Sequence, residues 1–202
     1  MSQLLVKPEE EVFPNRKRWT RAECADLLAT GRLQGRYELI DGELIQKMGQ
    51  NPPHSVTLLL FANWLVSLFG KLYVREQEPI RISGEDGDYN DPEPDIAVTR
   101  ETAIEYSIAH PTPQDLVLIV EVADTTLRFD LGTKALLYAR CGVPEYWVAD
   151  VVARRVHIYS GPSQQGYTEI KVSSANELAT VAPHSDSTVA VNTLFPPPAL
   201  RP

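Results

Sequence analysis

The sequence predicts a single α/β or α+β domain. Its 202 residues are enough to bury a core without disulfide or metal staples. Hydrophobic residues make up 43% and charged residues 23% of the chain, a balance typical of globular proteins. Segments with helical periodicity also alternate with short segments rich in β-formers. We expect an N-terminal arm over 1–18, a domain over 19–195 whose weakest signals fall in 176–195, and a tail over 196–202.

The first elements carry clear local signals. Thr20 and Glu23 form a capping-box pattern ahead of a short helix, and Gly31 follows as its stop. Segments 37–40 and 43–46 flank Asp41-Gly42, a pair that suits the positive φ angles of a two-residue turn. The sequence therefore predicts a helix followed by a hairpin.

The middle of the chain alternates between both element types. Asn51-Pro52-Pro53 precedes an apolar-periodic segment, 54–69, which predicts the main core helix. Strands are expected over 72–82 and 95–99, separated by an acidic loop. Segment 116–122 is almost continuous in Leu, Val and Ile, so we expect a central strand that is covered on both faces.

The last third predicts one helix and several short strands. The helix is expected over 130–141, weakened by Gly132 and stopped by Gly142 and Pro144. A hairpin is expected over 146–159, an edge strand over 167–172 and a last short strand over 188–191.

Charge and composition exclude some classes of protein. The net charge of -8 disfavours a protein that coats nucleic acid non-specifically, although eight acidic residues gather between Glu76 and Asp95 against one arginine, Arg81. No apolar run approaches the roughly 18 residues of a membrane span, and the N-terminus lacks a secretory segment. We therefore expect a cytoplasmic protein, not a membrane protein, with Cys24 and Cys141 as reduced, packed thiols.

Two carboxylates stand at the ends of expected strands. Glu121 ends the most apolar strand, where an unpaired charge would cost several kcal/mol or shift its pKa. Asp95 opens another strand after Pro94, and two such carboxylates can converge on one hard cation. The alternative is that Asp95 caps a turn while Glu121 pairs with Lys134 or an arginine. Spacing alone leaves both open.

Four further residues are candidates for the same site. Asp130 and Lys134, four apart on a helix, can form a simple ion pair, or Lys134 can return over the end of the Glu121 strand. Glu38 is either a third acid of the site or a surface charge of the hairpin. His54 is either an accessory site residue or a helix cap that faces solvent.

Taken as an ordered series, these residues resemble a known family, the Uma-two restriction endonucleases, a branch of the PD-(D/E)XK nuclease superfamily. The resemblance is strong from about residue 20 to 159 and weaker to 195. It rests on Tyr37-Glu38-Leu39-Ile40-Asp41-Gly42-Glu43-Leu44, His54, Pro94-Asp95, Glu121-Val122, Asp130, Lys134, Tyr138 and Gly142-Val143-Pro144-Glu145-Tyr146-Trp147.

The resemblance implies a restriction-endonuclease-like core, a mixed β-sheet flanked by helices. It implies Asp95 and Glu121 as ligands of Mg²⁺, with Mn²⁺ as the alternative ion, and Glu38, Asp95, Glu121 and Lys134 as the catalytic set. In such enzymes a metal-activated water attacks phosphorus while metal and lysine stabilise the developing charge. The superfamily pattern places its lysine two residues after the glutamate, where this chain has Ala123. Lys134 is the natural substitute.

Three functions follow as hypotheses. The first is a Mg²⁺-dependent DNA endonuclease, as a homodimer whose two sites would cut both strands. The second is a catalytically weak binding or regulatory protein with the same fold, which the acidic segment and Ala123 favour. The third is a domain that recognises a protein partner through its proline-rich tail.

Overall fold

The structure is a computed structural model that describes residues 16–47 and 49–197. Residues 1–15 of the predicted arm and 198–202 of the predicted tail lie outside the described residues. The division into arm, domain and tail therefore stays a prediction.

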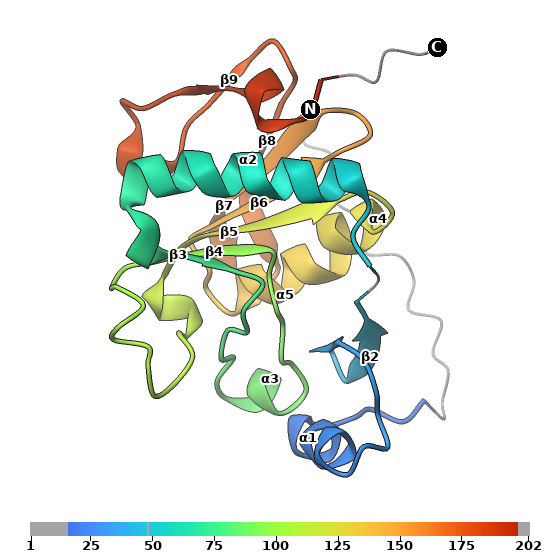
Figure 1. The fold of residues 1–202 in the computed structure, drawn as a ribbon. Helices are drawn as coiled ribbons and strands as arrows, with labels where there is room; N and C mark the ends of the chain where they lie inside the picture. Colours follow the sequence, from blue (N-terminus) through green and yellow to red (C-terminus); the bar gives the residue numbers. More distant parts are fainter. Residues whose placement is uncertain (1–15, 48, 198–202) are drawn as a thin grey trace, which may run out of the picture.

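A six-stranded mixed sheet forms the centre of the described chain (Figure 1). Its spatial order is β3-β4-β5-β6-β7-β8, and every neighbouring pair is antiparallel except β5 and β6. A parallel pair needs a crossover, which the helical segment between these two strands provides. The strands are β3 (Val74–Glu76), β4 (Ile96–Thr99), β5 (Leu116–Ala123), β6 (Glu145–Asp150), β7 (Arg155–Ser163) and β8 (Gly166–Ser173).

Helices cover both faces of this sheet, which confirms the predicted fold class. On one face lies α2 (Pro52–Phe69), whose Phe61 and Leu65 are fully buried among residues of β4 and β5. On the other lie α4 (Leu127–Phe129), a π-helical turn (Asp130–Lys134) and α5 (Ala135–Arg140), which buries Tyr138. The predicted central strand is confirmed, because β5 has neighbours on both sides and helices on both faces.

The N-terminal elements are a short helix and a two-stranded sheet that is not part of the six-stranded sheet. Helix α1 (Arg21–Ala29) begins at the predicted Thr20–Glu23 capping box. Strands β1 (Tyr37–Ile40) and β2 (Glu43–Gln46) pair as the predicted hairpin, with φ of 51° at Asp41 and 82° at Gly42. A backbone bridge between Leu39 and Asp91 joins this hairpin to the body of the protein.

Two predicted elements differ from the structure. The strand expected over 72–82 is reduced to β3, because Gln77 has φ of 54° and the next backbone N–H groups bond to loops: Ile80 to Pro92 and Arg81 to Pro111. The acidic loop that follows holds a short helix, α3 (Glu85–Asp88). The helix expected from 130 begins at Leu127, and its first turns are irregular.

The C-terminal segment returns over the α2 face of the sheet. The predicted edge strand is β8, and the predicted last strand is β10 (Val189–Ala190), which pairs with β9 (Leu178–Ala179). Val191, Leu194 and Phe195 are buried there, and the rings of Phe195 and Phe61 meet edge to face at 5.9 Å.

Among the described helices, α2 alone is long and apolar enough to cross a membrane, judged by length and composition. The expectation that no apolar segment approaches the roughly 18 residues of a membrane span was therefore wrong for this helix. Its mean hydropathy is 1.2 over 18 residues. A core helix passes the same test, and α2 lies on the sheet with one face in the core. A single helix of this kind is weak evidence for a membrane span.

Candidate active site

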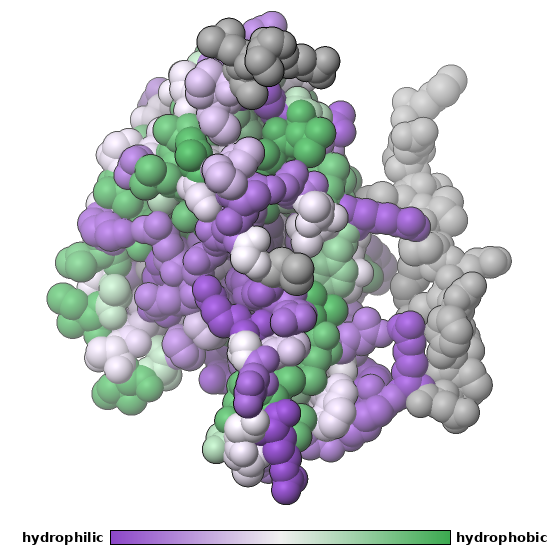
Figure 2. Space-filling view, turned by 45° about the vertical axis from the view of Figure 1, so that its right-hand side comes forward, coloured by the Kyte–Doolittle hydropathy of each residue, from purple (hydrophilic) through white to green (hydrophobic). Residues whose placement is uncertain are grey.

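A pocket of about 330 Å³ opens where β4 begins and β5 ends. These strands are antiparallel neighbours, with Ile96 opposite Val120, so residues just before β4 and near the end of β5 arrive at the same end of the sheet. Figure 2, with the pocket side turned toward the reader, shows hydrophilic residues around a hollow. The lining includes all six site residues predicted from the sequence: Glu38, His54, Asp95, Glu121, Asp130 and Lys134.

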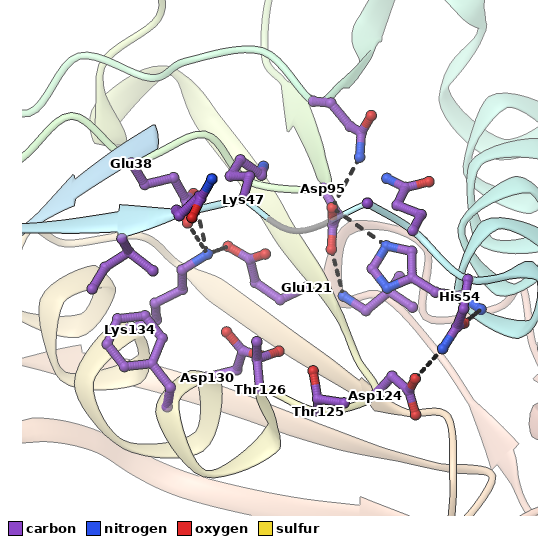
Figure 3. Close-up of a pocket in the computed structure, with 18 residues that line it drawn as sticks. Glu38, Lys47, His54, Asp95, Glu121, Asp124, Thr125, Thr126, Asp130 and Lys134 are labelled. Atoms are coloured by element: carbon purple, nitrogen blue, oxygen red, sulfur yellow. Dashed lines mark hydrogen bonds and ion pairs between the residues drawn. The ribbon is translucent and has the colours of Figure 1, made fainter. Parts of the chain in front are cut away.

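Lys134 joins two carboxylates from distant parts of the chain (Figure 3). Its Nζ lies 2.8 Å from Glu121 Oε1 and 2.9 Å from Glu38 Oε2. The three side chains are almost fully buried, and Glu38 also accepts a hydrogen bond from the backbone N–H of Glu93 at 2.8 Å. The helical segment after β5 therefore delivers an ammonium to Glu121, although the strand itself has Ala123 two residues after Glu121.

Burial and charge shift the pKa values of this pair. Burial raises the pKa of Glu121 to about 8, the carboxylates of Asp95 and Glu38 add to that rise, and Lys134 opposes it. Burial would by itself lower the pKa of Lys134, but the carboxylates of Glu121 and Glu38 raise it above its ordinary value. Lys134 therefore keeps its proton at physiological pH.

Asp95 lies in the same pocket but turns toward the start of α2. Its Oδ2 accepts a hydrogen bond from the backbone N–H of Val122 at 2.9 Å, and its Oδ1 accepts one from Gln77 at 3.3 Å. His54 Nε2 is 3.8 Å from Asp95 Oδ1, while the backbone N–H of His54 is capped by Asn51. Burial tends to raise the pKa of Asp95, but His54 and the Val122 N–H lower it below its ordinary value.

Asp130 is buried beside this cluster but does not pair with Lys134. It accepts a hydrogen bond from Thr126 Oγ1 at 2.5 Å, and burial raises its pKa. The simple ion pair over four residues is absent between these two described residues because the segment is a π-helical turn, whose wider winding removes the alignment of an α-helix.

Tyr138 also belongs to the site, although it was not among the six site residues predicted from the sequence. Its hydroxyl donates a hydrogen bond to Glu121 Oε1 at 3.0 Å, so this oxygen accepts hydrogen bonds from both Tyr138 and Lys134. The signal was available, because Tyr138 stands four residues after Lys134, and residues at that spacing share a helix face. Gln77 and Lys47 also line the pocket, and no sequence pattern distinguished them from surface residues.

The donor set fits a hard divalent cation. Among the described residues no three His, Cys, Asp or Glu side chains form a metal-binding group by themselves. Mg²⁺ needs fewer, since it is commonly held by one or two carboxylates with water and phosphate as the remaining ligands. Glu121 Oε2 accepts no hydrogen bond from a described residue, and His54 Nε2 beside Asp95 is buried without a hydrogen-bond partner among them. The pocket also gathers the buried carboxyl groups of Glu38, Asp95, Glu121 and Asp130 near one buried lysine, Lys134.

Comparison with known proteins yields a family and a similar structure. The family described as "Uma2: Putative restriction endonuclease" matches residues 25–191. A crystal structure from Anabaena variabilis, described as a putative nuclease belonging to DUF820, is similar with a TM-score of 0.59 and 18% sequence identity, over 84% of this chain and 96% of that one. At this identity the likeness shows the fold alone. No curated protein matches the chain. Because the family match spans most of the chain, including all six predicted site residues, this protein belongs to the Uma2 family.

Proposed function

We propose that this protein is a divalent-metal-dependent nuclease that hydrolyses phosphodiester bonds in DNA, with Mg²⁺ as the ion. The observation that carries the proposal is the placement of the Lys134 ammonium between Glu38 and Glu121, with Asp95 in the same pocket. Membership of a family described as restriction endonucleases supports it, and restriction-endonuclease-like families usually use divalent metals.

Each residue has a distinct task in this proposal. Asp95 and Glu121 hold the cation, which when bound supplies positive charge for the scissile phosphate and lowers the pKa of water. Lys134 keeps its proton and offers positive charge to the phosphoryl oxygens during bond cleavage. Glu38 and Tyr138 act as positioning residues, because they hold Lys134 and Glu121 in place.

The decisive experiment incubates the purified full chain with supercoiled, linear and single-stranded DNA in Mg²⁺, in Mn²⁺ or in chelator. We expect cleavage of at least one of these DNA forms in either metal and none in chelator. Glu121→Gln and Lys134→Met each remove one charge at nearly constant shape, and we expect each to lower the rate by a factor on the order of 10² or more. Lys171→Met changes an exposed lysine on β8 and is the matched control.

Two outcomes would contradict the proposal. Nicking that survives both Glu121→Gln and Lys134→Met belongs to a contaminant. The absence of cleavage by folded wild-type protein in both metals would favour the second candidate, a binding or regulatory protein with this fold. That candidate is favoured by one observation, namely that Lys134 is already engaged by two carboxylates. Circular dichroism of every variant separates lost chemistry from lost folding. The homodimer expected from the sequence stays a prediction.

A further inference from the structure

The candidate site is deep for an enzyme that would cut a double helix. Glu38, Glu121 and Lys134 are each at most 4% exposed, and Asp95 is 6% exposed. The pocket of about 330 Å³ is near the small end of the range of ligand sites, roughly 300–1,000 Å³. A pocket of this volume admits about one nucleotide, so the two paired strands of a duplex would stay outside it.

Contacts between separate segments close the walls of the pocket. The amide of Asn51, at the start of α2, donates to the carboxylate of Asp124, which follows β5. On the opposite side, Lys134 holds the β1–β2 hairpin through Glu38. Figure 3 shows these two ties at opposite sides of the site. Both contacts join segments that are distant in the chain, so the walls of the pocket are held in place on two sides.

The mouth of the pocket suits a base better than a row of phosphates. Its exposed lining residues carry no charge and all but Gly49 have polar side chains, while Phe129 adds an aromatic ring. The side chains of Gln46 and Thr125 make no hydrogen bond to a described residue, so their polar groups are available to a ligand. Glutamine amides pair with base edges, and aromatic rings stack on unpaired bases. The exposed lining residues are Gln46, Gly49, Gln50, Asn51, Thr125 and Thr126.

Positive charge at the mouth is scarce. Apart from Lys134, the only lysine among the described lining residues is Lys47, whose Nζ is bound to the Glu93 carbonyl at 2.8 Å and lies 3.6 Å from its carboxylate. Arg36 pairs with the same carboxylate. Arg128 is exposed next to Phe129 in the chain. Duplex binding usually neutralises several phosphates with clustered Lys and Arg, and these few cations meet that need poorly.

We propose that the site takes a single unpaired strand of nucleic acid. One phosphate of the strand enters toward Asp95 and Glu121, while its base stays at the mouth against Phe129 and Gln46. This inference rests on the proposed nuclease function for the identity of the site, and it names the substrate class of that site.

Binding and cleavage test the inference separately. A fluorescein-labelled 12-nucleotide DNA strand and the same strand in a blunt duplex are titrated with full-length protein in Ca²⁺, an oxygen-seeking ion that suits the same carboxylates. Fluorescence anisotropy should show that the single strand binds at least about tenfold more tightly, with a salt dependence equivalent to about one or two phosphates. In Mg²⁺, cleavage of a duplex with a central unpaired bubble should fall within the bubble.

The variants test whether the mouth binds the base. Phe129→Ala should weaken strand binding by about tenfold, and Gln46→Ala by about fivefold. Gln165→Ala, an exposed glutamine in the β7–β8 turn, should leave it unchanged. Tighter binding of the duplex, cleavage of fully paired DNA at the rate of the single strand, or wild-type binding by Phe129→Ala would each overturn the inference. Strand binding with these variant effects but without cleavage would uphold the inference while refuting the nuclease function.

Discussion

Glu145 shows how a single buried carboxylate ties two parts of this protein together. It lies on β6, where its Oε1 accepts from Trp147 Nε1 at 2.6 Å and its Oε2 accepts from the backbone N–H of Ala182 at 3.0 Å. The first contact is within the strand, whereas the second reaches the C-terminal segment over α2. Burial raises the pKa of Glu145, while these hydrogen bonds oppose the rise.

This shift predicts a pH dependence of stability. The folded protein holds a proton on Glu145 that the unfolded chain releases near pH 4.5, so the stability from this group falls as the pH rises from there through the raised pKa. Glu145→Gln cannot ionise. The difference in free energy of unfolding, variant minus wild type, should therefore become more positive as the pH rises from about 4.5 through the raised pKa of Glu145. Urea titrations of both proteins between about pH 4 and pH 8 measure this difference.

The matched control for this change is Glu169→Gln, which removes the same charge from an exposed position on β8. Its free energy of unfolding should follow that of the wild type at every pH. A difference between Glu145→Gln and wild type that stays constant with pH would contradict the predicted shift.

At the scale of elements, the β1–β2 hairpin decides whether the site is complete, because it carries Glu38 but lies outside the main sheet. Its turn depends on Gly42, which has φ of +82°. A Cβ added there would lie 2.8 Å from the Cβ of Arg18, whose guanidinium stacks on the ring of Tyr89. Backbone strain and a steric clash thus coincide at one residue.

We expect Gly42→Ala to lower the free energy of unfolding by about 2 kcal/mol, because a positive φ and a close contact both oppose the methyl group. Chemical denaturation measures this loss. Gly31→Ala is the matched control, since Gly31 also has a positive φ, +69°, but no atom within 4 Å of the added Cβ. It should cost about 1 kcal/mol. Equal losses in the two variants would show that the contact with Arg18 contributes nothing.

At the scale of the whole molecule, the acidic groups buried in the site favour the binding of a cation to the folded protein. The chain carries a net charge of -8, and the buried pocket gathers Glu38, Asp95, Glu121 and Asp130 around Lys134. A cation that binds only the folded protein stabilises it by mass action. Stability should therefore depend on metal even where no substrate is present.

We expect Mg²⁺ at about a hundred times its dissociation constant to raise the melting temperature by roughly 5–10 °C. Differential scanning fluorimetry at constant ionic strength measures the shift, and chelator should reverse it. Asp95→Asn should abolish the rise, whereas Asp186→Asn, the same change at an exposed position, should preserve it. An equal rise in both variants would place the metal elsewhere.

Much of the local structure follows from the sequence alone. Thr20 and Glu23 predict the start of α1, Asp41-Gly42 predicts the hairpin turn, and the apolar run 116–122 predicts the central strand. Each signal acts between residues that are near in the chain, through a cap, a positive φ or a continuous apolar stretch. The family pattern also singled out the six residues that meet in the pocket.

Only the tertiary structure decided how those residues meet. Glu38 and Lys134 are 96 residues apart in the chain, and their contact exists because the hairpin is folded against the end of the sheet. The π-helical turn aims Lys134 at Glu121 rather than at Asp130, and segment 77–82 bonds to loops instead of extending β3. The physical reason is the same in each case. Local patterns determine the conformation of neighbouring residues, whereas contacts between distant segments depend on how the whole chain packs.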